Sequence, residues 1–159
     1  MKNSLQVGIT HEFKFRITEN KTVPHLYPES AEFQNMPKVL ATGFLVGLCE
    51  WACIQAVNPH LDWPREQTLG IDVQLNHTAP TPPGFIVTVK VRLDQIKGRK
   101  LVFIIIADDG IETITEGTHT RFIIDVARFD DKLAVKIQSQ RSAVSGPIKE
   151  RSSTIHKEN

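Results

Sequence analysis

One long apolar segment, Leu40–Val57, constrains the fold more than any other feature of this chain. It is shorter than the ~20 apolar residues that a membrane span needs, and it carries Glu50 and Gln55. The Asn58-Pro59 pair ends it, because proline restricts the residue before it and cannot continue helical hydrogen bonding. Since the segment is apolar nearly all round, we expect a helix wrapped by other elements.

Alternating apolar and polar residues on both sides of this segment predict β-strands. The expected strands are 9–18, 67–77, 85–93, 100–107 and 112–126. The run 100–107 is continuously apolar and is expected to be buried on both faces. One strand, a helix and a meander of about four sequential antiparallel strands predict an α+β fold, in which the antiparallel sheet wraps around the long central helix.

Length and composition indicate one domain that does not bind nucleic acid. With 159 residues the chain fits a single core, which we place at residues 1–130, followed by a polar tail at 131–159. The tail is expected to begin as a helix and to fray or become disordered beyond Gln138. Balanced charge, 19 basic against 18 acidic residues, gives no basic surface for nucleic acid.

The sequence shows no secretory signal and no cysteine pattern of a disulfide framework or zinc site. The first ten residues lack the apolar core of a secretory signal, so we expect a cytoplasmic protein with no membrane partner. Cys49 and Cys53 fit buried reduced thiols, and their spacing matches neither a disulfide framework nor a zinc site. No motif calls for a metal or a nucleotide cofactor, so none is expected.

Glu50 is the only charged residue between Gly43 and Ala52. At ~100° per residue, it shares one helix face with Gly43 and Gly47, whose missing side chains leave room beside it. Glycine inside a helix costs about 0.5–1 kcal/mol relative to alanine, so the pair suggests close approach by a ligand or another backbone. Glu50 is therefore a candidate catalytic acid, base or nucleophile. The alternatives are a solvent-exposed position and a structural ion pair.

His77 and Thr42 are further candidates. Strand parity places His77 on the same, core-facing side as Ile71, Val73 and Leu75, at a strand end where a cleft could open. An inward histidine and an inward glutamate can manage protons at neutral pH, although His77 could also be a structural residue. Thr42 could cap the helix or contact a substrate. Direct contact between Thr42 and Glu50 is not expected, because eight residues of helix rise about 12 Å.

The last strand carries two polar candidates. Gly117, His119 and Arg121 share one face, and the other face, with Phe122 and Ile124, is the expected core side. Arg121 is then either a surface charge or an anchor for an anionic group or for Glu50. His119 is a weaker candidate, because no other feature of the sequence points to it.

Four motifs resemble one family. They are KTVPHLYPES (21–30), ATGFLVGLCEWAC (41–53), L-G-x-x-V with HTAPTPPG (69–84), and GTHTR (117–121). Over residues 7 to 130 the chain resembles the fluoroacetyl-CoA thioesterase-like branch of the hotdog superfamily. The resemblance implies a homodimer that binds acyl-CoA, with Thr42, Glu50 and His77 as catalytic residues. It also implies that Gly70 and Arg121 bind substrate, and that the acyl group lies between helix and sheet near the dimer interface.

The implied reaction is hydrolysis of a short-chain acyl-CoA thioester. Glu50 acts as nucleophile or as general base for water, and His77 handles protons. Thr42 and the backbone amide near Gly70 position the substrate or support the oxyanion. The alternatives are a non-catalytic acyl-CoA-binding module and a hydratase or dehydratase. The latter typically places Asp and His on one segment, a pattern not found here.

The segment between the first strand and the helix is the candidate lid. Its apolar residues Val23, Leu26, Phe33 and Met36 lie in a stretch punctuated by prolines. The fluoroacetate-selective enzyme that the chain resembles has a phenylalanine lid residue where Met36 stands. A flexible thioether need not gate a pocket as a rigid ring does. A short-chain substrate is therefore predicted without a preference for fluoroacetyl-CoA.

Overall fold

The computed structural model describes residues 1–144, and its main feature is a five-stranded antiparallel sheet against one long helix. The strands are β1 (Thr10–Arg16), β2 (Glu66–Leu75), β3 (Ile86–Lys97), β4 (Lys100–Asp108) and β5 (Thr113–Asp125). The helices are α1 (Ala31–Gln34), α2 (Thr42–Val57) and α3 (Val126–Val144), with short 3-10 helices at Glu19–Lys21, Val23–His25 and Asn58–His60. We call residues 1–126, which form one compact unit, the body.

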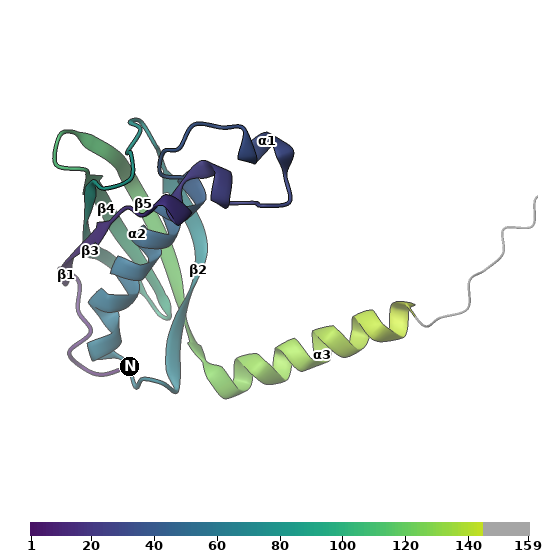
Figure 1. Cartoon of the computed structure of the whole chain (residues 1–159). Helices are drawn as coiled ribbons and strands as arrows, with labels where there is room; N and C mark the ends of the chain where they lie inside the picture. Colours follow the sequence, from purple (N-terminus) through teal and green to yellow (C-terminus); the bar gives the residue numbers. More distant parts are fainter. Residues whose placement is uncertain (145–159) are drawn as a thin grey trace, which may run out of the picture. The chain divides into compact units, whose positions relative to one another are not determined.

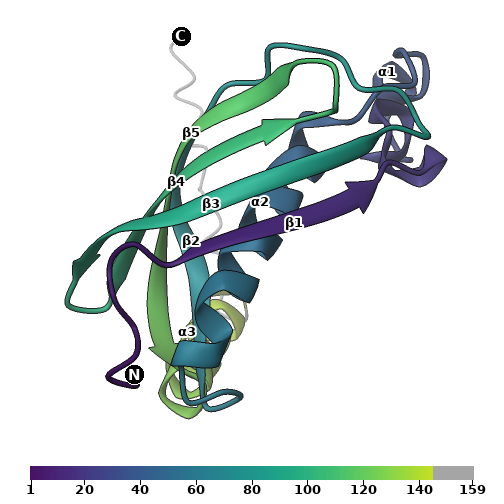
Figure 2. The same ribbon diagram turned by 90° about the vertical axis from the view of Figure 1, so that its left-hand side faces the viewer.

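The sheet curls around α2, as Figures 1 and 2 show. The helix ends at Val57, at the predicted stop, and begins at Thr42, two residues later than expected. Its sheet-facing side supplies much of the core: Leu45, Leu48, Cys49, Ala52, Cys53, Ala56 and Val57 are buried. Gly43, Gly47 and Trp51 are exposed in the single chain, so the sheet covers one side of the helix and leaves the other open. The predicted α+β fold is confirmed.

The strand order is β1-β3-β4-β5-β2. Strands β3, β4 and β5 form the expected meander, but β2 does not lie beside β3. It pairs with β5 at the far edge, with Gly70 opposite Arg121. The edge strands of the sheet are therefore β1 and β2, and the chain crosses from one edge to the other through α2.

Strand β4 is buried on one face only, so the prediction of burial on both faces was wrong. Leu101, Phe103 and Ile105 are fully buried against the core, whereas Ile106 on the other face is 44% exposed. A fully buried side chain of this size contributes about 1.5–3 kcal/mol to stability. The inner face therefore anchors the sheet on α2.

The register of β2 shifts between Gly70 and Asp72. The expectation that Ile71 faces the core was wrong, since it lies at the shift and is 51% exposed. Val73 is paired with His119 of the inner face but is still 42% exposed. An irregularity of this kind changes which side chains face which way along a strand. Thr68 is buried and Gly70 lies against α2 instead, and His77 follows two residues after the strand ends.

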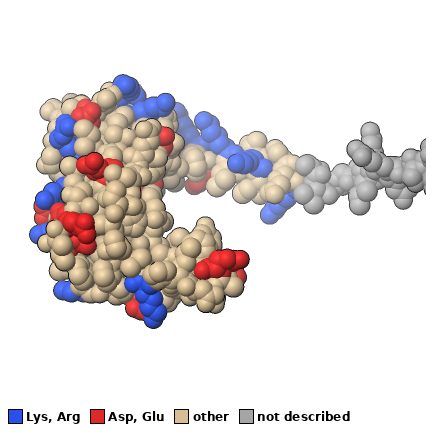
Figure 3. All heavy atoms as spheres, turned by 90° about the horizontal axis from the view of Figure 1, so that it is seen from above, with Lys and Arg blue, Asp and Glu red and all other residues tan. Residues whose placement is uncertain are grey.

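Charged side chains are spread over the body. On the face seen in Figure 3, acidic and basic side chains of the body are interspersed among other residues, and neither sign gathers in one broad patch. Among the described residues, no helix is both long and apolar enough to cross a membrane.

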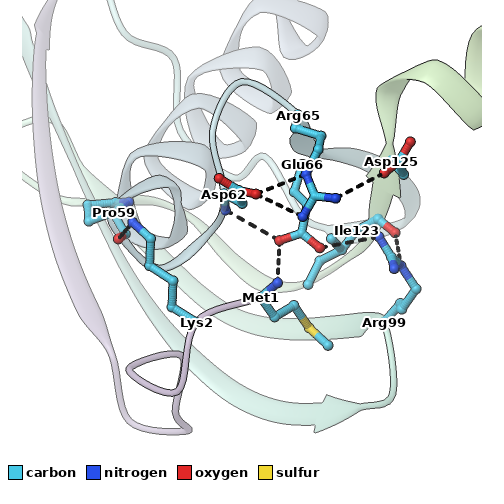
Figure 4. A network of polar contacts seen from close by, with 9 residues as sticks. All are labelled: Met1, Lys2, Pro59, Asp62, Arg65, Glu66, Arg99, Ile123 and Asp125. Atoms are coloured by element: carbon cyan, nitrogen blue, oxygen red, sulfur yellow. Dashed lines mark hydrogen bonds and ion pairs between the residues drawn. The ribbon is translucent and has the colours of Figure 1, made fainter.

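A polar network joins the start of the chain to the start of β2 (Figure 4). The terminal amine of Met1 contacts the Glu66 carboxylate, which also accepts from the Asp62 backbone amide at 3.3 Å and lies 3.7 Å from Arg99 Nη2. Glu66 is buried, so this carboxylate needs such partners to be tolerated. The amine beside it holds the pKa of Glu66 below its ordinary value.

The C-terminal unit begins at Ala127 and is formed, within the described residues, by α3. The predicted helix start at Ala127 agrees with the structure to within one residue. The helix continues past Gln138, where fraying was expected, and runs to Val144. The remainder of the predicted tail, 145–159, lies outside the described residues, and the domain boundary at residue 130 stays a prediction.

Candidate active site

The inner face of β5 carries a polar centre. His119 is 1% exposed and Arg121 is 2% exposed, and Ile123 on the same face is fully buried. The expectation that Phe122 and Ile124 mark the core side was therefore wrong, because both are only partly buried. Polar side chains can occupy this inner face only because they satisfy one another there.

Arg121 is held by three hydrogen bonds. It donates from Nε to the Thr68 hydroxyl at 2.9 Å and from Nη2 to the Thr68 carbonyl at 2.7 Å. Its Nη1 lies 2.9 Å from His119 Nε2. Burial lowers the pKa of Arg121, and Glu50 acts in the opposite direction. The guanidinium stays charged at any physiological pH and is fixed in orientation.

Glu50 reaches this centre from α2. Its Oε1 lies 3.5 Å from Arg121 Nη1 and 3.4 Å from His119 Nε2, and its side chain is 38% exposed. The carboxylate therefore has a buried cation on one side and open space on the other. Such a group can act on a molecule that enters from the open side of α2.

Gly70 makes room for Glu50. A Cβ built on Gly70 would overlap Glu50 Oε1 and lie 2.9 Å from His119 Cε1. The helix glycines have a different role from the one expected. A Cβ on Gly43 would meet Leu26 at 3.1 Å, and one on Gly47 would meet nothing within 4 Å. The missing side chain that admits the carboxylate belongs to β2 and not to α2.

Thr42 and His77 form a second group at the start of α2. The Thr42 hydroxyl and His77 Nδ1 are hydrogen bonded at 2.9 Å. Ala41 is the N-cap residue and Thr42 makes no capping bond, so the hydroxyl serves this contact instead. Burial lowers the pKa of His77, and a backbone contact at Ala79 partly offsets that effect. A largely neutral His77 at pH 7 can accept a proton.

A cavity of about 300 Å³ lies beside this pair. Its lining includes Thr42, His77, Val23, Val39 and Pro80. Among the described residues His77 Nε2 has no hydrogen-bond partner, although it is buried. The cavity is the natural place for a ligand that approaches the Thr42–His77 pair.

The predicted lid residues separate in the structure. Val23 lines the cavity, and Leu26 packs against Gly43 of α2. Phe33 packs on Tyr27, with ring centroids 5.4 Å apart, and Met36 is 49% exposed. Phe33 and Met36 are not among the residues that line this cavity.

The five polar or glycine candidates thus form two groups. Gly70, Glu50 and Arg121 come together. Thr42 and His77 come together at the start of α2, about two helix turns before Glu50. Sequence reasoning underrated His119 and missed Thr68 altogether. Strand alternation could have indicated that His119 faces the core, because His119, Arg121 and the apolar Ile123 share one face of β5.

Metal and thiol chemistry have little support here. Within residues 1–144, no group of three or more His, Cys, Asp or Glu side chains is arranged to hold a metal. Cys49 and Cys53 are buried, as predicted, and burial raises the pKa of Cys49 to about 12. Burial also raises the pKa of Cys53, so neither thiol is a ready nucleophile at pH 7.

Solved structures define the class of fold. At 22% identity, a member of the thioesterase superfamily from Thermus thermophilus superposes with a TM-score of 0.75, covering 89% of this chain and 98% of its own. A hot-dog-like protein from Thermanaerovibrio acidaminovorans, 17% identical, gives 0.70 over 83% of this chain and 93% of its own. The antiparallel sheet curled around α2 is thus a hotdog fold.

Closer relatives define the family. The family model described as fluoroacetyl-CoA-specific thioesterase matches residues 17–127. The fluoroacetyl-CoA thioesterase of Streptantibioticus cattleyicolor is 46% identical over 136 residues, 86% of this chain and 97% of that protein. A solved structure of a fluoroacetyl-CoA thioesterase, 45% identical, superposes with a TM-score of 0.81 over 84% of this chain and 98% of its own. The chain belongs to the fluoroacetyl-CoA-specific thioesterase family.

Proposed function

We propose that the protein hydrolyses short-chain acyl-CoA thioesters to the free acid and CoA. Membership of a thioester hydrolase family supports the reaction class. The observation that carries the proposal is the placement of Glu50, whose carboxylate is open to a ligand on one side and lies 3.5 Å from Arg121 on the other. A fluoroacetyl group is within this substrate class, and acetyl-CoA is the natural comparison.

Glu50 is the residue proposed to act on the thioester carbonyl. As a nucleophile it would form a mixed anhydride, which water then cleaves; as a general base it would remove a proton from the attacking water. In both routes CoA leaves through its sulfur, which gains a proton. In the general-base route that proton is the one Glu50 takes from water, and in the anhydride route it is the one released when water cleaves the anhydride. His77, neutral at rest, is proposed to accept this proton, which originates from water, and pass it to the thiolate.

Thr42, Gly70 and Arg121 are proposed to hold the substrate. The Thr42 hydroxyl lies beside the cavity at the start of α2, where it can donate to a carbonyl oxygen. Arg121 offers a buried positive charge, which stabilises negative charge that develops on an oxygen in the transition state. The backbone amide near Gly70 is the second candidate donor. Val23, Phe33 and Met36 are proposed to cover the acyl group when substrate is present.

A homodimer is proposed to complete the site. Strand β2 is an edge strand whose Leu69, Ile71 and Val73 are exposed, and an apolar edge of this kind pairs readily with another strand. A second copy on β2 would cover these residues. Because Glu50 lies about two turns along α2 from Thr42, the substrate or the partner subunit is proposed to bridge Glu50 and the Thr42–His77 pair.

A thiol-release assay tests the function directly. Acetyl-, fluoroacetyl-, propionyl- and longer acyl-CoA esters would be compared, and the fastest release is expected for two- and three-carbon acyl groups. Glu50→Gln should reduce kcat by about a hundredfold or more, because it removes the reacting carboxylate and keeps its shape.

Two outcomes would contradict the proposal. Tight binding of acyl-CoA by the wild-type protein without thiol release would indicate a binding module. Wild-type turnover by both Glu50→Gln and His77→Ala would show that these residues are not the catalytic ones. Glu12→Gln serves as the control, because Glu12 lies on β1 and its carboxylate pairs with Lys14 at the surface.

A further inference from the structure

His119 is fixed in one protonation state by its two neighbours. Its Nδ1 lies 2.8 Å from the backbone carbonyl of Asp72, and its Nε2 lies 2.9 Å from Arg121 Nη1. A carbonyl oxygen only accepts, so Nδ1 carries the hydrogen. A guanidinium only donates, so Nε2 offers its lone pair. The ring is therefore the neutral tautomer with hydrogen on Nδ1.

In this tautomer His119 is not a cationic partner of Glu50. The Glu50 carboxylate and His119 Nε2 are 3.4 Å apart, but both are hydrogen-bond acceptors in this state. They form no ion pair. The cation that Glu50 faces is Arg121, whose Nη1 has two hydrogens, so that one remains after the bond to His119, and this Nη1 lies 3.5 Å from Glu50 Oε1.

We infer that His119 is a positioning residue, which accepts a hydrogen bond from Arg121 and so aims the guanidinium at Glu50. Thr68 holds Arg121 at Nε and Nη2, and His119 holds it at Nη1. Without the imidazole, Nη1 would lose its lateral partner and could turn away from Glu50. The catalytic consequence rests on the proposed function, whereas the tautomer does not.

The surroundings favour the neutral ring. Burial lowers the pKa of His119, and the nearby charge of Arg121 lowers it further. Glu50 from α2 and Asp72 from β2 act in the opposite direction. A proton on Nε2 would point at the guanidinium and break the hydrogen bond, so the arrangement needs an uncharged imidazole.

Nitrogen NMR on the wild-type protein tests the tautomer without any assay of turnover. With ¹⁵N-labelled histidine, Nδ1 of His119 is expected to give a pyrrole-type signal and Nε2 a pyridine-type signal at about pH 7. The His119→Gln spectrum assigns the resonance. An imidazolium, or hydrogen on Nε2, would overturn the inference whether or not the protein is a thioesterase.

Kinetics test the positioning role. His119→Gln can place Oε1 as an acceptor near the former Nε2, so it should keep kcat within about threefold, whereas His119→Leu should lower kcat by about ten- to a hundredfold with little change in KM. His60→Gln is the matched control, since His60 is bonded to Ser4 away from this centre. Equal kcat values for the Gln and Leu variants would overturn the role. If His119→Leu does not fold, the NMR measurement still decides.

Discussion

The Glu50 carboxylate fills the position that a side chain at Gly70 would take: a single carbon added to Gly70 would overlap Glu50 Oε1. The glycine is on β2 and the glutamate is on α2, so neither element alone reveals the constraint. The atoms that a Cβ would meet are the ends of side chains and not backbone. A larger residue at position 70 would therefore displace the carboxylate before it disrupted the fold.

Gly70→Ala is expected to lower kcat/KM by about a hundredfold, because a displacement of about 1 Å at a reacting group has an effect of that size. Its free energy of unfolding should fall by only about 1 kcal/mol. Activity and urea unfolding of the same preparation provide the measurement. The control is Gly47→Ala, whose added Cβ would meet nothing within 4 Å. A Gly70→Ala enzyme with wild-type kcat/KM would show that Glu50 need not stay in place.

Ile71→Asp is expected to separate the proposed dimer. Ile71 is half exposed on edge strand β2, and a carboxylate there would be buried without a partner if a second copy covered it. Light scattering after size exclusion should show a dimer for the wild type and a monomer for the variant. Ile111→Asp, at a 77% exposed position outside β2, should leave the mass unchanged. A variant that stays dimeric would exclude this edge as the interface.

Mixed dimers can show whether the two polar groups act across subunits. If Glu50 of one protomer works with His77 of its partner, a heterodimer of Glu50→Gln and His77→Ala contains one intact site. Random mixing of the two inactive proteins should then restore about one quarter of wild-type activity. No recovery, with heterodimers shown by mass spectrometry, would mean that each protomer supplies both residues to the same site.

Acid is expected to weaken the fold in two steps. Burial lowers the pKa values of His77 and His119 below the ordinary 6.5, so the unfolded chain binds protons that the folded chain resists. The free energy of unfolding should therefore decrease as pH falls below 6.5 toward the lowered pKa values. Glu66 behaves differently: its pKa lies below 4.5, and its stabilising contacts are present above 4.5 and lost as pH falls through the folded pKa.

Urea unfolding between about pH 8 and about pH 3 separates these steps. His77→Gln should make the first step smaller, since glutamine does not titrate and only His119 then contributes. Glu66→Gln should flatten the second and lower stability at neutral pH by about 1.5–3 kcal/mol, the usual range for a hydrogen bond to a charged group. Unchanged pH profiles in both variants would show that other groups control acid unfolding.

Periodicity predicted those elements whose environment repeats along the chain. Strand β3 follows from the alternation of its own side chains, since Val87, Val89 and Val91 are buried on one face. The end of α2 follows from the Asn58-Pro59 pair instead. The register of β2 could not be predicted in this way. Its irregularity between Gly70 and Asp72 places Ile71 outward, and nothing in the local alternation announces it.

The sequence indicated most of the individual site residues, but it did not indicate which of them lie together. Glu50 stood out because it is a lone charge in an apolar helix. His119 did not, because its burial depends on Arg121, on Asp72 and on the carboxylate that arrives from α2. The strand pattern places His119 on the same face as Ile123, but contacts with distant segments decide whether a polar residue can be buried there.

The buried arginine has an unusual attachment. Two of the three hydrogen bonds of Arg121 go to Thr68 of β2. The third goes to His119, whose ring is itself bonded to the Asp72 carbonyl of β2, so all three depend on this strand. In the isolated chain β2 has a hydrogen-bonded neighbour on one side only. Local opening of that edge would release the guanidinium while β1, β3 and β4 stayed folded. Mild denaturant should therefore abolish turnover before the protein as a whole unfolds. A strand paired with the free edge of β2 would raise the denaturant concentration at which turnover is lost.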